Sequence, residues 1–369
     1  MTRIEFIKMC GILGVSLPFQ GMLMSCIKDD DVNINSFSGK VIIIGAGAGG
    51  LSAGYLLQQQ GIDFEILEAS AVYGGRMKIN TDFADFPIPL GAEWLETSTD
   101  IFQEIVNDSA IPVDVETIPD TPDRKFVNSS WFSFFEEYII PSISNKIVYN
   151  TIVQSIDYSG DQVSINTQNG EYLADKAIIS VPLKILQDGD ISFLPNLPQD
   201  KLNVINDSII WEGFKAFFEF SENFYDDEFE FEIIPSTDGE KIYYNAAFGQ
   251  NTTKNIIGLF VVGKPALDFT SLSGNELKDF ILNELDGIYA NQATPNYIKH
   301  ITQDWDNEPF IKAGYLTDNA DWRNVKKLGE SVANKIYFAG GAYTDGEDWV
   351  SVHTAAQSAK VAIEEIIRQ

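Results

Sequence analysis

The sequence predicts an α/β fold, on the strength of two local patterns and the size of the chain. Lys40–Ile44 is a short β-branched run of the kind that forms a strand buried on both faces. A glycine-rich turn leads from it into a helix-forming stretch, residues 51–60, which Gly61 closes as a C-cap, and a second strand is expected at residues 64–67. The length of 369 residues and the apolar fraction of 44% suffice for two domains, each with its own core.

The glycine-rich turn has the spacing of a dinucleotide-binding motif. Gly45 permits a tight turn, Gly47 lets the backbone approach a pyrophosphate, and Gly50 lets the helix pack against the strand. The helix N-terminus offers N–H groups to phosphates, and Glu68, 18 residues after Gly50, can accept hydrogen bonds from ribose hydroxyls. These features predict a Rossmann-like domain whose ligand-binding residues in this region are Gly45, Gly47, Ala48, Gly49, Gly50, Glu68 and Ala69.

Composition excludes several other classes of function. The chain has 25 Lys and Arg against 54 Asp and Glu, a net charge of −29 that repels phosphates, so we expect no nucleic-acid partner. Both cysteines, Cys10 and Cys26, precede residue 30, and His300 and His353 are the only histidines. The body of the chain therefore offers no disulfide, no thiol nucleophile and no cysteine- or histidine-rich metal site, and we expect no metal cofactor.

Residues 1–25 have the pattern of a secretory signal, because Arg3 and Lys8 precede an apolar stretch too short and interrupted to span a membrane. The stretch ends in Leu23–Cys26, which resembles the lipobox of bacterial lipoproteins. This resemblance implies a signal peptide over 1–25, an acidic tether over 26–38, and an exported protein held at the outer membrane or cell surface by a lipid on Cys26. An ordinary N-terminal helix stays open as the alternative. Residues 2–8 also resemble a twin-arginine signal that lacks its second arginine, so both export routes stay open.

Beyond the ribose-binding acid, the sequence continues into a second diglycine and an arginine. Gly74 and Gly75 permit another close approach of the backbone, and Arg76 can neutralise a pyrophosphate. At this point the chain resembles the flavin-containing amine oxidase family, which includes monoamine, polyamine and L-amino-acid oxidases. Further segments resemble the family in the same order along the chain, namely residues 90–94, 153–182, 191–198, 213–218, 305–315, 337–341 and 352–358.

The resemblance implies FAD as the cofactor, bound non-covalently because no cysteine beyond Cys26 could attach it. The single catalytic candidate is Lys215, since the matching lysine of the family holds a water against flavin N5. A lysine that merely points outward from an alternating strand is the alternative. Besides the glycine turn, the resemblance places these residues at the cofactor: Gly75, Arg76, Gly91, Ala92, Glu93, Trp94, Val153, Trp305, Gly340, Gly341 and Ser351.

The resemblance also implies a division into domains. The FAD-binding domain is expected to be discontinuous, over residues 39–98, 146–190 and 331–369, and a mixed α+β substrate domain is expected over 99–145 and 191–330. Residues 95–152, 58 in all, stand where relatives usually carry a longer helical insertion, which predicts a more open site.

The favoured function is FAD-dependent oxidation of an amine, with hydride transfer to flavin N5 and reoxidation by oxygen. Two alternatives stay open. One keeps FAD and changes the reaction to a C–C desaturation or a porphyrinogen-type oxidation. The other is a surface lipoprotein that retains the fold and has lost turnover.

Overall fold

The computed structural model describes residues 37–108, 111–119, 121–225, 232–233, 238–317, 321–345 and 350–368. All of them belong to one unit, residues 36–369. The predicted signal peptide and Cys26 lie outside the described residues, as does all of the predicted tether except residues 37 and 38. Within the described ranges, no helix combines the length and the apolar character that a membrane span needs.

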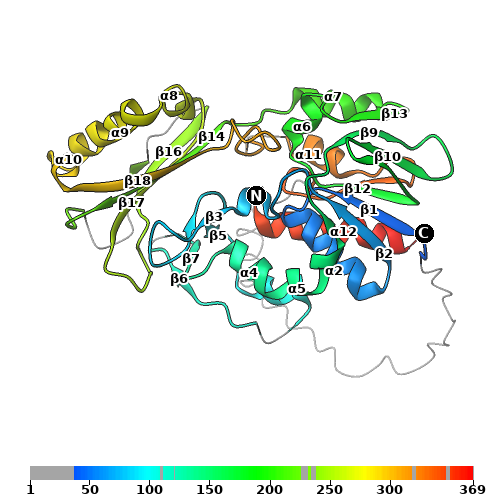
Figure 1. Cartoon of the computed structure of the whole chain (residues 1–369), viewed down its shortest axis with the longest axis horizontal. Coiled ribbons are helices and arrows are strands. Elements are labelled where there is room, and N and C mark those ends of the chain that lie inside the picture. The colour runs from blue at the N-terminus through cyan, green and yellow to red at the C-terminus, as the bar shows by residue number, and fades with distance from the viewer. Residues whose placement is uncertain are drawn as a thin grey trace, which may run out of the picture. The chain divides into compact units, whose positions relative to one another are not determined.

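A five-stranded parallel sheet carries the predicted glycine turn (Figure 1). Its strand order is β19–β12–β1–β2–β8, with β1 (Lys40–Ile44) at the centre. The strand is buried because other layers cover both faces of the sheet, as its unbroken β-branched run predicts. The remaining strands are β2 (Asp63–Leu67), β8 (Ile147–Val148), β12 (Lys176–Ile179) and β19 (Ile336–Phe338).

Two helices that pack against each other cover one face of this sheet, α2 (Ala48–Gln60) and α12 (Val352–Ile367). Gly61 ends α2 in the left-handed conformation at φ 67°, which confirms the predicted C-cap. The helix starts three residues earlier than the apolar pattern predicts, because Gly47 already serves as its N-cap.

The opposite face carries a four-stranded sheet in the order β11–β10–β9–β13. Three strands are antiparallel, and β13 (Ser192–Leu194) adds to β9 in parallel. β13 completes this sheet, and α7 and α11 pack into the same core, although the predicted substrate domain included all three. The other elements of this layer are β9 (Val153–Asp157), β10 (Val163–Thr167), β11 (Gly170–Ala174), α6 (Leu183–Gln187), α7 (Gln199–Asp207) and α11 (Trp322–Gly329).

A second five-stranded sheet, in the order β15–β16–β17–β14–β18, forms the main part of the predicted substrate domain. One face packs on α9 (Gly274–Ile288), and the other packs on residues 83–90. Every residue of β14 (Gly213–Phe220), which lies between β17 and β18, is buried. The other elements are β15 (Glu232–Ile233), β16 (Gly239–Asn245), β17 (Asn255–Gly263), η3 (Lys264–Ala266), α8 (Leu267–Thr270), α10 (Ala293–Asn296) and β18 (Tyr297–Asp304).

The segment that stands in place of the longer insertion packs against the FAD-binding side of the molecule. Phe102, Trp131 and Phe134 from this segment share one hydrophobic core with α2 and β1. The elements between β2 and β8 are η1 (Gly75–Met77), β3 (Ile79–Asn80), β4 (Ile88–Pro89), β5 (Trp94–Leu95), α3 (Asp100–Val106), β6 (Val115–Thr117), β7 (Arg124–Phe126), α4 (Trp131–Tyr138), α5 (Ile140–Ile143) and η2 (Ser144–Lys146).

Candidate active site

A cavity of about 1060 Å³ extends from the glycine turn after β1 to β14 and β17 of the second sheet. Of the predicted site residues, Gly50 alone does not line it. The structure thus brings together residues that are far apart in the sequence, although their individual roles stay predictions. The predicted residues on the cavity wall are Gly45, Gly47, Ala48, Gly49, Glu68, Ala69, Gly75, Arg76, Gly91, Ala92, Glu93, Trp94, Val153, Lys215, Trp305, Gly340, Gly341 and Ser351.

Each glycine of the turn is required at its position for a different structural reason. A Cβ on Gly50 would lie 1.9 Å from the carbonyl oxygen of Gly45, so Gly50 serves the packing of helix on strand and faces away from the cavity. Gly45 has φ 102°, which favours glycine. A Cβ on Gly47 would meet nothing within 4 Å, so this residue borders open space in the cavity. Such an open cradle fits the close approach of a pyrophosphate.

Glu68 shapes the turn as well as facing the cavity. Its Oε2 accepts a hydrogen bond from the N–H of Ala46 at 2.7 Å, while Oε1 accepts from the N–H of Ser70 at 2.8 Å and from its hydroxyl at 2.7 Å. A carboxylate has about four lone-pair sites, so capacity is left for ribose hydroxyls. The backbone bonds hold the carboxylate in place for that contact.

Arg76 brings a positive charge to the wall of the cavity. Its guanidinium donates to the carbonyl oxygen of Gly314, and burial lowers its pKa. Among the described residues, no carboxylate forms an ion pair with it. The first turn of α2 has neither an acidic residue nor a side-chain cap. These two features fit the anionic pyrophosphate of FAD.

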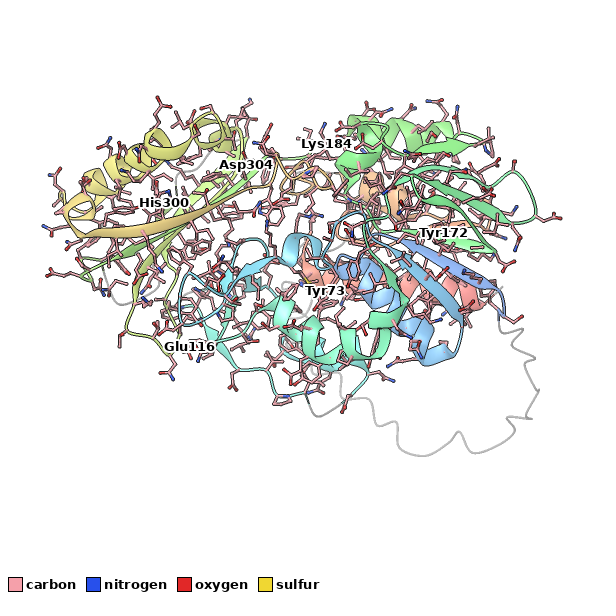
Figure 2. The ribbon with its side chains drawn as sticks, in the orientation of Figure 1. Tyr73, Glu116, Tyr172, Lys184, His300 and Asp304 are labelled. Carbon is pink, nitrogen blue, oxygen red and sulfur yellow. The ribbon has the colours of Figure 1, made fainter. Side chains whose placement is uncertain are left out.

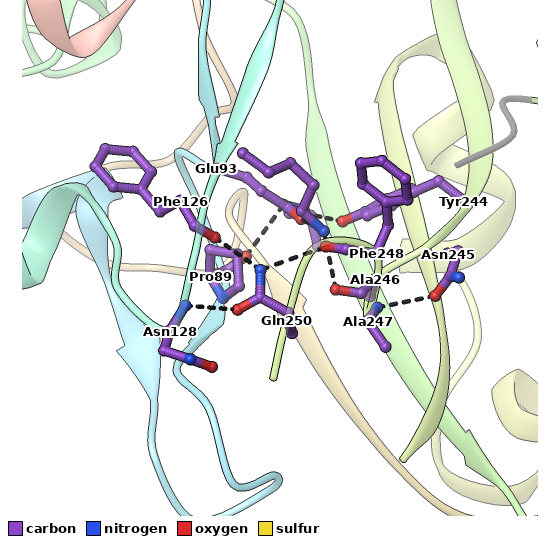
Figure 3. A network of polar contacts seen from close by, with 12 residues as sticks. Pro89, Glu93, Phe126, Asn128, Tyr244, Asn245, Ala246, Ala247, Phe248 and Gln250 are labelled. Atoms are coloured by element: carbon purple, nitrogen blue, oxygen red, sulfur yellow. Dashed lines mark hydrogen bonds and ion pairs between the residues drawn. The ribbon is translucent and has the colours of Figure 1, made fainter. Parts of the chain in front are cut away.

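Lys215, Glu93, Lys125 and Tyr244 form a buried cluster beside the cavity, which we call the Glu93 cluster (Figure 3 labels Glu93 and Tyr244). The Nζ of Lys215 lies 2.6 Å from Oε2 of Glu93, and the Nζ of Lys125 lies 3.1 Å from Oε1. The hydroxyl of Tyr244 donates to Glu93 as well, and Lys125 donates to the carbonyl oxygen of Ala246 at 2.8 Å. One carboxylate thus contacts two lysines and a tyrosine, which come from the three strands β14, β7 and β16.

The cluster has more positive than negative groups. Burial lowers the pKa of Lys215 and of Lys125, and Glu93 opposes both shifts. Burial alone would raise the pKa of Glu93, but the two ammonium groups together lower it. Glu93 is therefore ionised, and two protonated lysines would leave one net positive charge beside the cavity.

The contacts of Lys215 bear on its predicted role. Its ammonium donates to the carbonyl oxygens of Pro89 at 3.0 Å and Gly91 at 3.1 Å, in addition to Glu93. An ammonium group has three N–H donors, and these three acceptors use them all. Holding a water against flavin N5 would require one of these bonds to be exchanged, so that role stays a prediction.

Two members of the cluster were missed by the sequence analysis. Lys125 follows Arg124 in a short polar stretch, where a lysine is expected to be exposed, and Tyr244 stands between Tyr243 and Asn245. No local pattern marks either residue, because their common partner Glu93 is brought to them only by the fold.

Aromatic side chains form the walls near Lys215. The Trp94 ring lies 5.0 Å from the Nζ of Lys215 and contacts the Tyr244 and Phe260 rings. Trp305 is buried and donates from Nε1 to the carbonyl oxygen of Leu90 at 3.1 Å. Both tryptophans therefore combine structural contacts with a place on the cavity wall.

The C-terminal segment closes the cavity from another direction. Ser351 is the N-cap of α12 and forms a capping box with Thr354. His353 is buried and contacts the Ser351 hydroxyl. Within the described ranges, His, Cys, Asp and Glu form no group of three or more that could hold a metal ion.

Comparison with known proteins gives two family-level matches. Residues 136–367 match the family model described as flavin containing amine oxidoreductase, and residues 43–108 match an NAD(P)-binding Rossmann-like domain. The second match covers the glycine turn, and the first covers most of the cavity lining beyond it.

Several curated proteins are similar to this chain. Lysine-specific histone demethylase 1B of Mus musculus is 26% identical over 168 residues, which cover 44% of this chain and 20% of that protein. The chain spans about a fifth of the length of the mouse and human histone demethylases that it matches. Polyamine oxidase 2 of Arabidopsis thaliana is 23% identical over 390 residues, covering 76% of this chain and 78% of that protein.

A solved structure is similar over nearly the whole chain. An engineered putrescine oxidase, redesigned in its cofactor binding, superimposes with a TM-score of 0.71 over 89% of this chain and 99% of its own. Its sequence identity is 14%, so this likeness concerns the fold alone. With the Rossmann-like match, it confirms the predicted fold class, an α/β nucleotide-binding domain with a mixed substrate domain.

Proposed function

Because the chain belongs to the flavin containing amine oxidoreductase family, we propose that it is an FAD-dependent enzyme that oxidises an amine. The observation that carries this proposal is the single cavity that joins the glycine turn and Glu68 to Lys215 and the Trp94 wall. Bound FAD would supply the redox chemistry, taking a hydride from the carbon that bears the amine nitrogen and passing the electrons to oxygen.

The protein's own residues would hold the cofactor and shape the reaction space. Glu68 would accept from the ribose, while the α2 N-terminus and Arg76 would bind the pyrophosphate. Trp94, Phe260 and Trp305 would exclude water near the substrate. The positive charge of the Glu93 cluster would stabilise negative charge that develops close to Lys215.

The pairing of charges in the cavity favours an amine over an α-amino acid. Recognition of a substrate carboxylate needs an available cation. Lys78 pairs with Glu308 at 2.7 Å, Lys312 pairs with Asp190 at 2.6 Å, and Lys215 pairs with Glu93. Of the described cavity-lining cations, only Arg76 has no ion-pair partner among the described residues, and its guanidinium donates to the carbonyl oxygen of Gly314. A substrate without a carboxylate suits this arrangement.

The test is anaerobic reduction of the flavin in purified protein comprising residues 27–369. We expect a flavin absorption spectrum that bleaches with simple amines and does not bleach with the α-amino acids of the same side chain. Peroxide should appear when oxygen is admitted. Bound FAD that no amine reduces would instead favour the desaturase or porphyrinogen-type alternative. A protein that takes up no flavin would favour the non-catalytic reading.

We further propose that the mature protein is an exported lipoprotein with its lipid on Cys26. The support is the Leu23–Cys26 pattern that follows a signal-like stretch. Metabolic labelling with a fatty acid should mark the wild type and Cys10→Ser, the matched control, but not Cys26→Ser. Equal labelling of the wild type and Cys26→Ser would refute this proposal. Protease treatment of intact cells would then separate the cell surface from the inner side of the outer membrane.

A further inference from the structure

Two aromatic rings meet at the edge of the cavity where the loop after β2 reaches α4. Tyr73 and Phe132 stack with their ring centroids 5.2 Å apart and their planes 3° from parallel, and both residues line the cavity (Figure 2 labels Tyr73). The Tyr73 hydroxyl donates to Oε1 of Glu136, one turn further along α4, at 3.3 Å. This contact joins the loop to a helix of the segment that replaces the longer insertion.

The stack lies directly against the diglycine turn. A Cβ on Gly74 would lie 2.9 Å from the Phe132 ring, so the ring occupies the space that any side chain at this position would need. The N–H of Gly74 donates to the carbonyl oxygen of Ala46 at 2.8 Å, and a Cβ on Gly75 would lie 3.5 Å from the Cα of Gly47. The Phe132 ring therefore packs against the diglycine, and the diglycine in turn packs against the glycine turn.

The helix that carries Phe132 is well anchored. Trp131 is buried and donates from Nε1 to the carbonyl oxygen of Trp94 at 3.0 Å. Ser130 caps the helix by accepting from the N–H of Ser133 at 3.0 Å. Because Trp131 precedes Phe132 directly, the position of the Phe132 ring is fixed relative to both the Trp94 wall and the diglycine.

We propose that Tyr73 and Phe132 form a clasp that retains FAD by holding the diglycine turn against its pyrophosphate. The clasp keeps Gly75 close to Gly47 and holds the backbone directly before Arg76, which also lines the cavity. In this chain the short segment thus contributes to cofactor retention. The inference depends on FAD binding and does not depend on an amine being the substrate.

The hydrogen bond from the Tyr73 hydroxyl to Glu136 helps to orient the Tyr73 ring in the clasp. Burial, and then the neighbouring Glu136 carboxylate, raise the pKa of Tyr73 to about 12, so the phenol stays protonated and donates throughout the neutral range. The larger share of the contact lies in the stacked rings, because Glu136 is exposed and the hydrogen bond is long.

The experiment measures the release of FAD from loaded protein without any substrate. Loaded protein is diluted, and the rise of free-flavin fluorescence gives the rate of release. Phe132→Ala should release FAD faster by on the order of tenfold, because it removes the stack and the contact with Gly74. Tyr138→Ala is the matched control, since Tyr138 is also a half-buried aromatic on α4 but does not line the cavity. It should release FAD at the wild-type rate.

Two further variants separate the stack from general loosening of α4. Tyr73→Phe keeps the stacked rings and should release FAD within about twofold of wild type. Phe132→Leu keeps apolar bulk beside Gly74, preserves folding if the alanine variant does not fold, and should still speed release. Equal release rates for wild type and Phe132→Leu would overturn the clasp. A wild type that binds no FAD would overturn the cofactor assignment itself, which is a different result.

Discussion

Lys215 donates to Glu93 at 2.6 Å, and this buried contact joins strand β14 of the second five-stranded sheet to the residue just before β5. Both side chains are almost fully buried, so their charges interact with little screening by water. Lys125 and Tyr244 contact the same carboxylate from two other strands. Glu93 therefore holds together three elements that enclose one end of the cavity.

Replacing Lys215 with methionine should destabilise the protein by about 3 kcal/mol or more, because it leaves a buried carboxylate oxygen and two carbonyl oxygens without their donor. Urea denaturation gives the loss. Lys241→Met is the control, since Lys241 forms a more exposed pair with Glu284 and should cost less than about 1 kcal/mol.

The same variant separates a structural from a catalytic role of Lys215. If the ammonium also acts on the flavin, stopped-flow reoxidation by oxygen should slow by ~10²–10³ in protein that is still folded and fully loaded. Reoxidation at the wild-type rate in such protein would limit Lys215 to holding Glu93. A loss of stability equal to that of Lys241→Met would contradict the structural role.

Lys125→Met should cost less than Lys215→Met, because Glu93 keeps Lys215 and Tyr244 as partners and the excess positive charge is removed. Lys125→Met should also change how the stability of the folded protein depends on pH. The folded-state pKa of Lys125 lies below the ordinary 10.5, so the unfolded chain binds more protons between these two values and stability rises with pH there. Denaturation midpoints from pH 7 to 10 should rise less steeply in the variant. An unchanged slope would contradict this assignment.

The sequence was most informative where a local pattern determines the contact. The run from Lys40 to Gly61 predicted a strand, a turn, a helix and its cap, because each depends on neighbouring residues, and all four are observed. The cavity lining could be predicted only through the family resemblance, since the lining residues come from distant segments. Lys125, Tyr244 and Phe132 carried no local signal, because their contacts depend on how the segments pack.

Glu68→Ala should raise the dissociation constant of FAD by about 10- to 100-fold, because each hydrogen bond to a carboxylate contributes about 1.5–3 kcal/mol. The variant loses a ribose acceptor, and it also frees the N–H groups of Ala46 and Ser70 that fix the turn. Titration of apoprotein with FAD, followed by quenching of flavin fluorescence, measures the effect. Glu65→Ala is the control, since Glu65 lies on β2, just before Glu68, and outside the cavity lining, and it should bind FAD normally. Equal affinity of the two variants would contradict the role of Glu68.

Asp306 gives a prediction about acid stability. Burial raises the pKa of Asp306 from the ordinary 3.8 to about 6, and the nearby carboxylates of Asp304 and Glu212 add to this shift. A hydrogen bond from the N–H of Gly213 to its Oδ1, at 3.2 Å, opposes the shift in part. Between these two pKa values the folded protein binds more protons than the unfolded chain, so this group makes stability fall as pH rises from about 4 to about 6.

Asp306→Asn should remove this contribution, because the amide oxygen can still accept from Gly213 while the charge is gone. Above pH 6 the variant should be more stable than wild type by about 1 kcal/mol, a figure reduced for the partial exposure of the side chain. Near pH 4 the two proteins should be equally stable, since Asp306 is then protonated in the folded state. Urea midpoints measured from pH 4 to 8 test both expectations. A constant difference across this range would show that the gain comes from something other than the ionisation of Asp306.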